Sequence, residues 1–512
     1  MLQGETRCDR MLAMNRRSFL KNSALASAAA FAAQAGWAQP SSFTSVRLTL
    51  DPHRRGNPIP ADFTGLSYET AQLGDPTFFS PANTELIGFI RRLGPSGVLR
   101  IGGNTSEYSY WTPQGAPPEN EAQRERNEAN VLEQAVGPDT GHGPAKHRKI
   151  TPKAIENLAA FVHQTGWKLI YGLNMGTEDA DIAAAEAACV MHAIGDRLIA
   201  FQLCNEPDLF SRNGLRKPDY NYAQFAKEWQ HFYEVIRQKV PNAPFAGPDT
   251  AFNNEWLVPF AKQFKNEAAF LSQHYYAEGP PTDPSMTIDR LLRPNPKLAA
   301  EFQGMAETKA ESHLPFRLAE TNSCYQGGKQ GVSDTFASAL WGADLMYQLA
   351  TAGGVGINFH GGGYGWYTPI AGTVPNGFVA RPIYYGMLLF AEAGPGHLID
   401  ARLDNPQLPL LTAYGLVNET GDGGGVKAVI FNKAASRALR LTVDSGGSAT
   451  EARALRLIAP RLDDTTDVTL GMNPAGPSGA WHAAEEEALP IHNGAAGLDL
   501  PPGSAALVSF SS

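Results

Sequence analysis

The stretch LIAFQLCNEP, residues 198–207, decides the fold. It has the length and composition of a buried strand, yet it ends in Asn205, Glu206 and Pro207, where an unpaired carboxylate would cost free energy. Seven other runs have a similar composition, namely DFTGLSYE (62–69), GVLRIGGN (97–104), KLIYGLN (168–174), APFAGPDT (243–250), AFLSQHYY (269–276), FRLAETNS (316–323) and VGINFHGGG (355–363). Because helix-length segments separate these runs, the sequence predicts a parallel (β/α)8 TIM barrel, an α/β fold, rather than an open doubly wound sheet.

The segment TPKAIENLAAFVHQTGW, residues 151–167, shows how the helices between the strands are encoded. Thr151 is a typical N-cap residue and Pro152 suits the first helical position. Apolar side chains recur at helical spacing on one face, at Ile155, Leu158, Phe161 and Val162. This pattern predicts an amphipathic helix that packs on the barrel.

The pattern changes after Arg381. Short strand-like runs follow at hairpin spacing, with the turn signals NETGDGGG (418–425) and DSGGS (444–448) between them. We therefore expect a barrel domain over residues 62–390 and an antiparallel β-sandwich domain over residues 391–512. The run SVRLTLDP (45–52) predicts that an N-terminal strand within residues 41–61 joins the sandwich before the chain enters the barrel.

The first 38 residues predict an export signal rather than part of the fold. The motif NRRSFLK (15–21) places paired arginines before an apolar, alanine-rich run, and Gly36 and Ala38 are small residues at the positions that specify cleavage. This is typical of a twin-arginine signal, so we expect a periplasmic or secreted protein. No later stretch reaches the ~18 to 20 uninterrupted apolar residues that a membrane span needs.

Composition excludes several classes of function. The formal net charge of −9 gives no reason to expect a nucleic acid or an anionic membrane as partner. The chain has no G-x-S-x-G elbow, no H-E-x-x-H zinc motif, no P-loop and no G-x-G-x-x-G after a strand, and we expect neither a cofactor nor a metal.

Two glutamates carry the chemistry that the predicted barrel would support. Glu206 lies at the C-terminal end of the predicted fourth strand and Glu320 ends the seventh, so both belong to the barrel mouth where catalytic residues lie. Paired carboxylates at this face are typical of glycosidases. Their separation decides the mechanism, at about 5 to 5.5 Å for a retaining enzyme and ~6.5 to 9.5 Å for an inverting one.

These motifs resemble a known family. Asn205-Glu206-Pro207 together with Glu320 is similar to the signature of retaining glycoside hydrolases of clan A. More narrowly, LRIGGN, CNEP and AETNSCYQGG, followed by a sandwich domain, resemble glycoside hydrolase family 79, which contains heparanases and β-glucuronidases. The resemblance covers nearly the whole chain after the signal.

The resemblance implies a role for each of these residues. Glu206 would be the general acid and then the general base, and Glu320 the nucleophile. Asn205 would bind the 2-hydroxyl of the sugar, and Tyr276 would hold Glu320 through its hydroxyl. Glu69 and Asn104 would bind the far hydroxyls of the sugar, although Glu69 stands where the animal enzymes have a shorter aspartate. His360 is expected to contact Glu320 or the sugar rather than a metal.

A glucuronidase also needs a site for the C6 carboxylate of the sugar, and no arginine is adjacent to either glutamate in the sequence. The motif CYQGGK offers the hydroxyl of Tyr325 and the unobstructed amides of Gly327 and Gly328. By resemblance these residues and Tyr367 bind the uronate. The alternative is that Gly327 and Gly328 only make a tight turn.

The interpretation is therefore a retaining, exo-acting β-glucuronidase that removes terminal β-D-glucuronic acid, plain or 4-O-methylated, from glycans or glycosides. The polar segment 112–149 follows the second strand, and we expect it to be either a pocket wall or lid or a solvated insertion. Three alternatives stay open: a clan A β-glucosidase or xylosidase for a neutral sugar, an endo-acting enzyme like heparanase, and a non-catalytic carbohydrate-binding protein.

Overall fold

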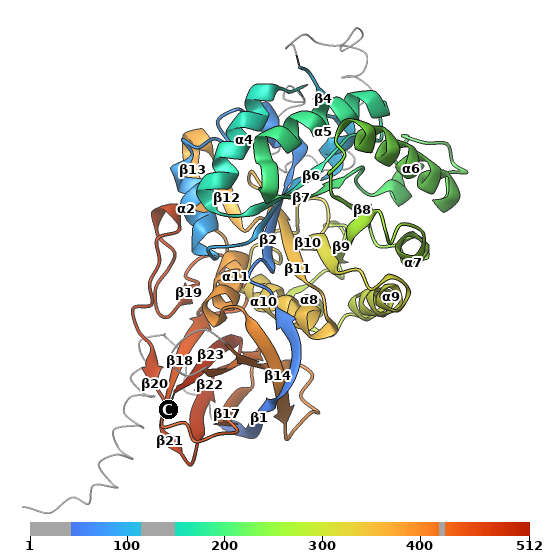
Figure 1. Ribbon diagram of the computed structural model, residues 1–512. Coiled ribbons are helices and arrows are strands. Elements are labelled where there is room, and N and C mark those ends of the chain that lie inside the picture. The colour runs from blue at the N-terminus through green and yellow to red at the C-terminus, as the bar shows by residue number, and fades with distance from the viewer. Residues whose placement is uncertain (1–41, 114–148, 419–424, 512) are drawn as a thin grey trace, which may run out of the picture.

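The computed structural model describes residues 42–113, 149–418 and 425–511. They form a barrel of strands and helices and, below it in Figure 1, a mainly antiparallel sheet. The predicted signal at residues 1–38, and residues 114–148 of the predicted wall or lid, lie outside the described residues. None of the described helices is long and apolar enough to cross a membrane.

In the described part of the chain the eight predicted strands form one closed parallel barrel, which confirms the predicted fold class. Their order around the barrel is β10, β11, β2, β3, β6, β7, β8 and β9. Nearly every residue in these strands is buried, which explains why they appear as continuous apolar runs. The strands are β2 (Thr64–Glu69), β3 (Val98–Gly102), β6 (Lys168–Gly172), β7 (Leu198–Gln202), β8 (Phe245–Thr250), β9 (Ala268–Glu278), β10 (Phe316–Cys324) and β11 (Gly356–Gly361).

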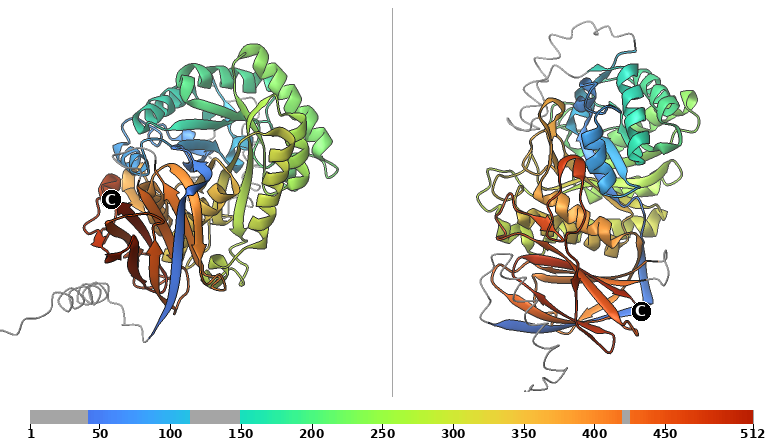
Figure 2. Two further views of the ribbon diagram at one scale, coloured as in Figure 1. Left: turned by 60° about the horizontal axis from the view of Figure 1, so that its bottom comes forward. Right: turned by 90° about the vertical axis from the view of Figure 1, so that its left-hand side faces the viewer.

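The barrel helices begin and end at signals that the sequence shows. In α4 (Pro152–Thr165) the Thr151 hydroxyl accepts the Ala154 amide at 3.2 Å, and the helix ends at Gly166, whose φ of 80° suits glycine. Figure 2 shows the helices arranged around the strands. The other helices are α2 (Thr84–Arg92), α5 (Ala180–Ile194), α6 (Tyr222–Lys239), α7 (Asn254–Gln263), α8 (Ile288–Leu292), α9 (Pro296–Ser312), α10 (Phe336–Ala352) and α11 (Pro382–Ala393).

Short 3-10 helices and short strands lie in the loops of the barrel and in one loop of the C-terminal sheet. They include η2 (Asn104–Tyr108), which follows β3, and η4 (Pro207–Leu209), which follows Glu206. The others are η1 (Thr70–Gly74), η3 (Gly195–Arg197), η5 (Val374–Asn376), η6 (Pro477–Gly479), β4 (Tyr110–Trp111), β5 (Lys149–Ile150), β12 (Ile370–Thr373) and β13 (Gly377–Ala380).

The second part of the protein is a single curled sheet of eleven strands among the described residues. Its first strand, β1 (Phe43–Ile59), is the predicted N-terminal strand, and it pairs antiparallel with β14 (Gly396–Leu403) and parallel with β17 (Ala438–Asp444). The strand β1 therefore connects two halves that would otherwise be separate sheets. The remaining strands are β15 (Leu411–Val417), β16 (Val426–Asn432), β18 (Glu451–Ile458), β19 (Thr469–Leu470), β20 (Glu487–Ala488), β21 (Ile491–His492), β22 (Ala495–Leu500) and β23 (Ser504–Ser511).

A buried polar cluster ties this sheet to the barrel. Asp344 on α10 forms an ion pair with Lys433, which follows β16, and both side chains are almost fully buried. The hydroxyls of Thr412 and Tyr414 on β15 donate to the same carboxylate at 2.8 and 2.7 Å. Breaking a buried pair by removing one partner is strongly destabilising, so this cluster holds the sheet against α10.

Candidate active site

Glu206 lies just beyond the end of a barrel strand rather than within it. The strand β7 ends at Gln202, four residues before Glu206, whereas the sequence suggested a strand that continued to the glutamate. Glu206 has φ 49° and ψ 54°, a left-handed conformation that is unfavourable for glutamate, and its amide donates to the carbonyl of Asp249 at 2.9 Å. This turn leaves the side chain only 12% exposed, close to His274.

Glu320 lies within β10, and cationic and hydroxyl groups surround its carboxylate. Tyr276 of β9 donates its hydroxyl to Glu320 Oε1 at 2.7 Å, which is the contact that the sequence resemblance implied. Arg100 of β3 forms an ion pair with the other oxygen, and His360 Nδ1 lies 3.6 Å from it. Burial acts to raise the pKa of Glu320, but the charges of His360, His274 and Arg100 together with the Tyr276 hydrogen bond hold that pKa well below its usual value.

The two glutamates face each other across a short gap. A carboxylate oxygen of Glu206, one of Glu320 and a ring nitrogen of His274 all lie within 4.8 Å of one another. This spacing is close to the ~5 to 5.5 Å of retaining glycosidases and well below the ~6.5 to 9.5 Å that leaves room for a water in inverting ones. The geometry therefore favours direct attack by one carboxylate.

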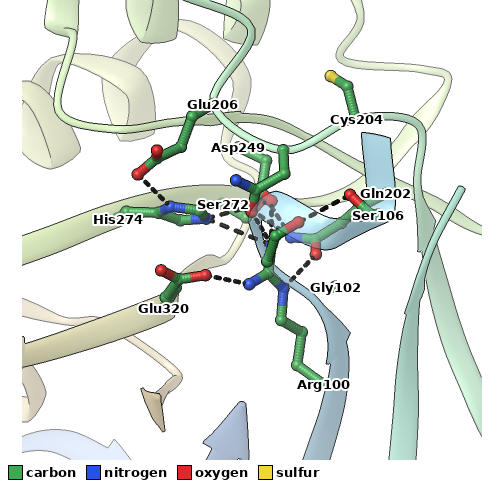
Figure 3. A network of polar contacts seen from close by, with 12 residues as sticks. Arg100, Gly102, Ser106, Gln202, Cys204, Glu206, Asp249, Ser272, His274 and Glu320 are labelled. Carbon is green, nitrogen blue, oxygen red and sulfur yellow. Dashed lines mark hydrogen bonds and ion pairs between the residues drawn. The ribbon is translucent and has the colours of Figure 1, made fainter. Parts of the chain in front are cut away.

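The sequence reasoning did not identify His274, which sits between the acidic groups (Figure 3). Its Nδ1 lies 3.1 Å from Glu206 Oε1 and its Nε2 lies 3.2 Å from Asp249 Oδ2. Burial opposes the charge, but Asp249 and Glu320 raise the pKa of His274 to about 10. With both nitrogens protonated, one toward Glu206 and the other toward Asp249, the ring has no lone pair to offer, so this trio does not suit a metal ion.

Arg100 was also missed, because it is far from both glutamates in the sequence. Besides Glu320, its fully buried guanidinium donates to Asp249 Oδ2 at 2.7 Å, to Asn205 Oδ1 at 2.8 Å and to Gln202 Oε1 at 2.9 Å. An arginine does therefore lie beside Glu320 in space. All of these contacts are within the protein, and the signal that could have revealed Arg100 is a charged residue in the middle of an apolar strand.

The predicted sugar-binding residues come together on one side of this network. Asn205 Nδ2 donates to Asn104 Oδ1 at 3.3 Å, and His360 Nε2 lies 3.4 Å from Glu69 Oε1. The other oxygen of Glu69 accepts the amide and the hydroxyl of Thr105 at 2.8 and 2.5 Å. Burial opposes protonation of His360, but Glu320 and Glu69 raise its pKa.

The predicted uronate-binding residues form a second group beside Glu320. The ring of Tyr276 lies 6.4 Å from that of Tyr325 and 6.2 Å from that of Tyr367, between ring centroids. Gly327 and Gly328 are buried and have φ of 84° and 90°, which favours glycine. A Cβ on Gly328 would lie 2.8 Å from the Tyr367 amide nitrogen. The glycines thus do form a tight turn, and that turn packs against Tyr367.

Asn322 of β10 fixes the loop that carries Tyr367. Its side-chain amide donates to the carbonyls of His360 and Tyr367 at 2.8 and 3.1 Å. The residue that lies two positions after Glu320 therefore links the end of β11 to the predicted uronate-binding group.

Several buried groups make the stability of the protein depend on pH. Burial raises the pKa of Glu107 and Glu301 to about 8 and that of Glu186 to about 7. His274 and His360 also have raised pKa values. From about pH 5 to about pH 8 the folded state therefore binds more protons than the unfolded state, and stability falls as pH rises.

We expect the melting temperature to be highest near pH 5 and to decrease steadily toward pH 8. The loss should correspond to at least ~2 kcal/mol, because each pKa unit represents about 1.4 kcal/mol. Below about pH 4 the depressed pKa values of Glu320 and Asp249 reverse the sign. Thermal unfolding followed by circular dichroism checks this, and a melting temperature that rises from pH 5 to pH 8 would contradict it.

The chain is similar in sequence to a known enzyme family and to individual members of it. Residues 149–347 match the model of "Glycosyl hydrolase family 79, N-terminal domain". A β-glucuronidase of Neurospora crassa is 24% identical over 402 residues, covering 69% of this chain and 67% of that protein. A β-glucuronidase of Aspergillus niger is 26% identical over 395 residues, covering 70% and 67%.

A solved structure shares the fold. The 4-O-α-L-rhamnosyl-β-D-glucuronidase of Fusarium oxysporum 12S superposes with a TM-score of 0.70 at 17% identity, covering 91% of this chain and 100% of that one. The alignment extends over both the barrel and the curled sheet, since it spans nearly the whole chain.

Proposed function

The chain belongs to glycoside hydrolase family 79, and from this premise we propose that it is a retaining, exo-acting β-glucuronidase. Its substrate would be a terminal β-D-glucuronic acid residue, plain or 4-O-methylated, on a glycan or glycoside. The observation that carries the proposal is the pair of buried carboxylates, Glu206 and Glu320, with oxygens within 4.8 Å of each other. This separation fits a double displacement.

In the first step Glu320 acts as the nucleophile. One of its oxygens attacks the anomeric carbon while the bond from that carbon to the glycosidic oxygen breaks. The carboxyl proton of Glu206 moves to the departing oxygen, so the aglycone leaves as a neutral alcohol. The low pKa of Glu320 keeps the attacking carboxylate ionised.

In the second step Glu206, now a carboxylate, takes a proton from water. The water oxygen attacks the anomeric carbon and the bond to Glu320 breaks, which restores both side chains and releases the sugar with its original configuration. Arg100 and Tyr276 bind the Glu320 oxygens, so both favour the carboxylate as the leaving group. Asn205 supplies an amide donor for the 2-hydroxyl.

For the C6 carboxylate we propose Tyr325, Gly327, Gly328 and Tyr367. The support is the position of the two tyrosines beside Tyr276, whose hydroxyl binds the nucleophile, and the absence of side chains on the two glycines. Two aromatic hydroxyls and backbone amides can bind a carboxylate without a counter-charge from arginine. Glu69, Asn104 and His360 would bind the remaining hydroxyls.

The alternatives are less well supported. A neutral-sugar enzyme would not need the Tyr325 group, and a binding module would need neither an ionised nucleophile nor an acid. An endo-acting enzyme for sulfated chains would want basic subsites, and the sequence has no cluster of lysine and arginine beside the motifs. Exo action is tested by the products, because an endo-acting enzyme would shorten a glucuronate-containing chain without releasing the monosaccharide.

The test compares p-nitrophenyl β-glucuronide with p-nitrophenyl β-glucoside. We expect kcat/KM for the glucuronide to exceed that for the glucoside by at least about 100-fold, because a site built for a polar group rejects the analogue that lacks it. The variant Tyr325→Phe should lose about tenfold or more on the glucuronide, equivalent to one hydrogen bond to a charged group, and little on the glucoside.

Two outcomes would count against the proposal. Preference for the glucoside would leave the glycosidase chemistry but remove the uronate assignment, returning Gly327 and Gly328 to the role of a turn. An equal loss on both substrates in Tyr325→Phe would mean that the tyrosine shapes the pocket without reading the carboxylate.

We also propose that the protein is exported, on the support of Arg16, Arg17 and the apolar run that follows them. Sequencing the N-terminus of the protein from the periplasm or medium tests this. A mature chain should begin near Gln39, and a protein that keeps residue 1 and stays in the cytoplasm would overturn the proposal.

A further inference from the structure

The carboxylate of Glu107 has no part in the steps above, yet it contacts the acid/base motif. Glu107 belongs to η2, the short helix after β3, and only 2% of its surface is exposed. Its Oε1 accepts the backbone amide of Asn205 at 2.5 Å and its Oε2 accepts the backbone amide of Gly176 at 2.6 Å. One buried carboxylate therefore joins the loops that follow β6 and β7.

The contact with the Asn205 amide lies directly before a residue with a strained backbone. The next residue is Glu206, whose left-handed backbone is unfavourable for glutamate and persists only where neighbouring contacts hold it. Its own amide is held by the carbonyl of Asp249 at 2.9 Å. The backbone amides of Asn205 and Glu206 therefore each have an acceptor. The Glu107 side chain accepts the first, and the Asp249 carbonyl of β8 accepts the second.

Gly176, whose amide is the second donor to Glu107, is also held in place. Arg216 donates to the carbonyls of Gly176 and Met175 at 2.9 and 3.0 Å, and its Nε lies 3.1 Å from both carboxylate oxygens of Glu228 on α6. A Cβ on Gly176 would lie 2.6 Å from Glu107 Oε2. The Glu107 carboxyl group therefore fits against residue 176 because glycine has no side chain.

We propose that Glu107 is a positioning residue for the acid/base: by accepting the amides of Asn205 and Gly176, it holds the strained turn that directs the Glu206 carboxyl toward the glycosidic oxygen. This inference rests on the proposed function, since it assigns Glu206 the proton transfer. Glu107 touches no reacting atom and acts through the backbone of the motif.

The test uses Glu107→Gln, which keeps the size of the side chain but replaces one acceptor oxygen by an NH2 group. That group cannot accept an amide proton, so one of the two contacts is lost. The substrates are two aryl β-glucuronides, a phenyl glycoside that needs protonation to leave and a dinitrophenyl glycoside that does not. The readout is the ratio of their kcat/KM values, because kcat/KM reports the first step alone whereas the second step is the same for both substrates.

We expect Glu107→Gln to lower kcat/KM for the phenyl glucuronide by about 10- to 100-fold, part of what general acid catalysis contributes, with a much smaller change in kcat/KM for the dinitrophenyl glucuronide. The matched control is Glu186→Gln, the same substitution at a buried carboxyl on α5 that accepts the Tyr171 hydroxyl at 2.6 Å. Its ratio should equal that of the unsubstituted enzyme.

A merely structural role for Glu107 predicts a different result. Partial unfolding would lower both kcat/KM values equally and leave their ratio unchanged, which would overturn the proposal. If Glu107→Gln fails to fold, Gly176→Ala provides the test. Its Cβ would lie 2.6 Å from Glu107 Oε2 and 2.9 Å from Glu107 Cβ, so it displaces that side chain while residue 107 remains a glutamate. The ratio should fall in that variant too, and an unchanged ratio would overturn the proposal.

Hydrogen exchange gives a second readout, which distinguishes failure of the positioning role from failure of the proposed glucuronidase function. Hydrogen exchange at the Asn205 amide, followed by mass spectrometry of the peptide that contains it, should be at least about tenfold faster in Glu107→Gln than in Glu186→Gln. Failure of the proposed function would appear as no glucuronide turnover by the unsubstituted enzyme. Failure of the positioning role would appear as unchanged exchange, whether or not the enzyme turns over.

Discussion

Replacing Glu320 by glutamine should lower hydrolysis of an aryl β-glucuronide by about 10⁴- to 10⁶-fold, the scale seen when a covalent nucleophile is removed. An amide does not attack the anomeric carbon, and the substitution removes one of the two carboxylates that form ion pairs with Arg100. The measurement is the initial rate of p-nitrophenol release under saturating substrate. Glu186→Gln, a buried substitution outside the site, should retain full activity.

The smaller variant Glu320→Ala tests the role more directly. The space left by the carboxylate admits azide, which would attack the anomeric carbon from the same face as Glu320 and yield the α-glycosyl azide. Formation of that product identifies Glu320 as the nucleophile. Activity of Glu320→Gln above about one hundredth of normal would instead place the nucleophile elsewhere.

Replacing Glu206 by alanine should produce an effect that depends on the leaving group. For a phenyl glucuronide, whose aglycone needs a proton, kcat/KM should fall by about 10²- to 10⁴-fold, the contribution of general acid catalysis. For a dinitrophenyl glucuronide, whose aglycone leaves as a stable anion, kcat/KM should change little. The second step still lacks its base, so kcat should become limited by hydrolysis of the glycosyl-enzyme.

Azide also distinguishes the two mechanisms in this variant. In a retaining enzyme azide replaces the water that Glu206 would activate, so it should raise kcat and give the β-glycosyl azide. In an inverting enzyme no glycosyl-enzyme accumulates, and azide would not produce a β-product from Glu206→Ala. The absence of any β-azide would therefore contradict the assignment that the separation of 4.8 Å or less supports.

The fold and the two glutamates were predictable from local signals. The eight apolar runs form the barrel strands, because strands covered on both faces must be apolar throughout. Helix α4 begins at its predicted cap for a local reason as well, since the Thr151 hydroxyl satisfies an amide three residues later. The contact between Tyr276 and Glu320 followed from the family resemblance.

The network around the glutamates was not predictable in this way. Arg100, His274 and Asp249 come from β3, β9 and β8, and each is an ionisable residue in a run that otherwise indicates a buried strand. From the sequence alone, the partner of such a residue cannot be identified. Only closure of the barrel brings the three side chains together, and their mutual charges then make the buried positions tolerable.

The amino-acid sequence by itself determined the order of strands and helices, their caps and turns, and the placing of two carboxylates at the barrel mouth, because each depends on contacts within a few residues. The tertiary structure alone decided the short distance between Glu206 and Glu320, the ionised state of Glu320, the clamp formed by Glu107, and the joining of two sheet halves by β1. Those properties arise from contacts between residues tens to hundreds of positions apart, and their energies depend on distance and burial in the folded chain.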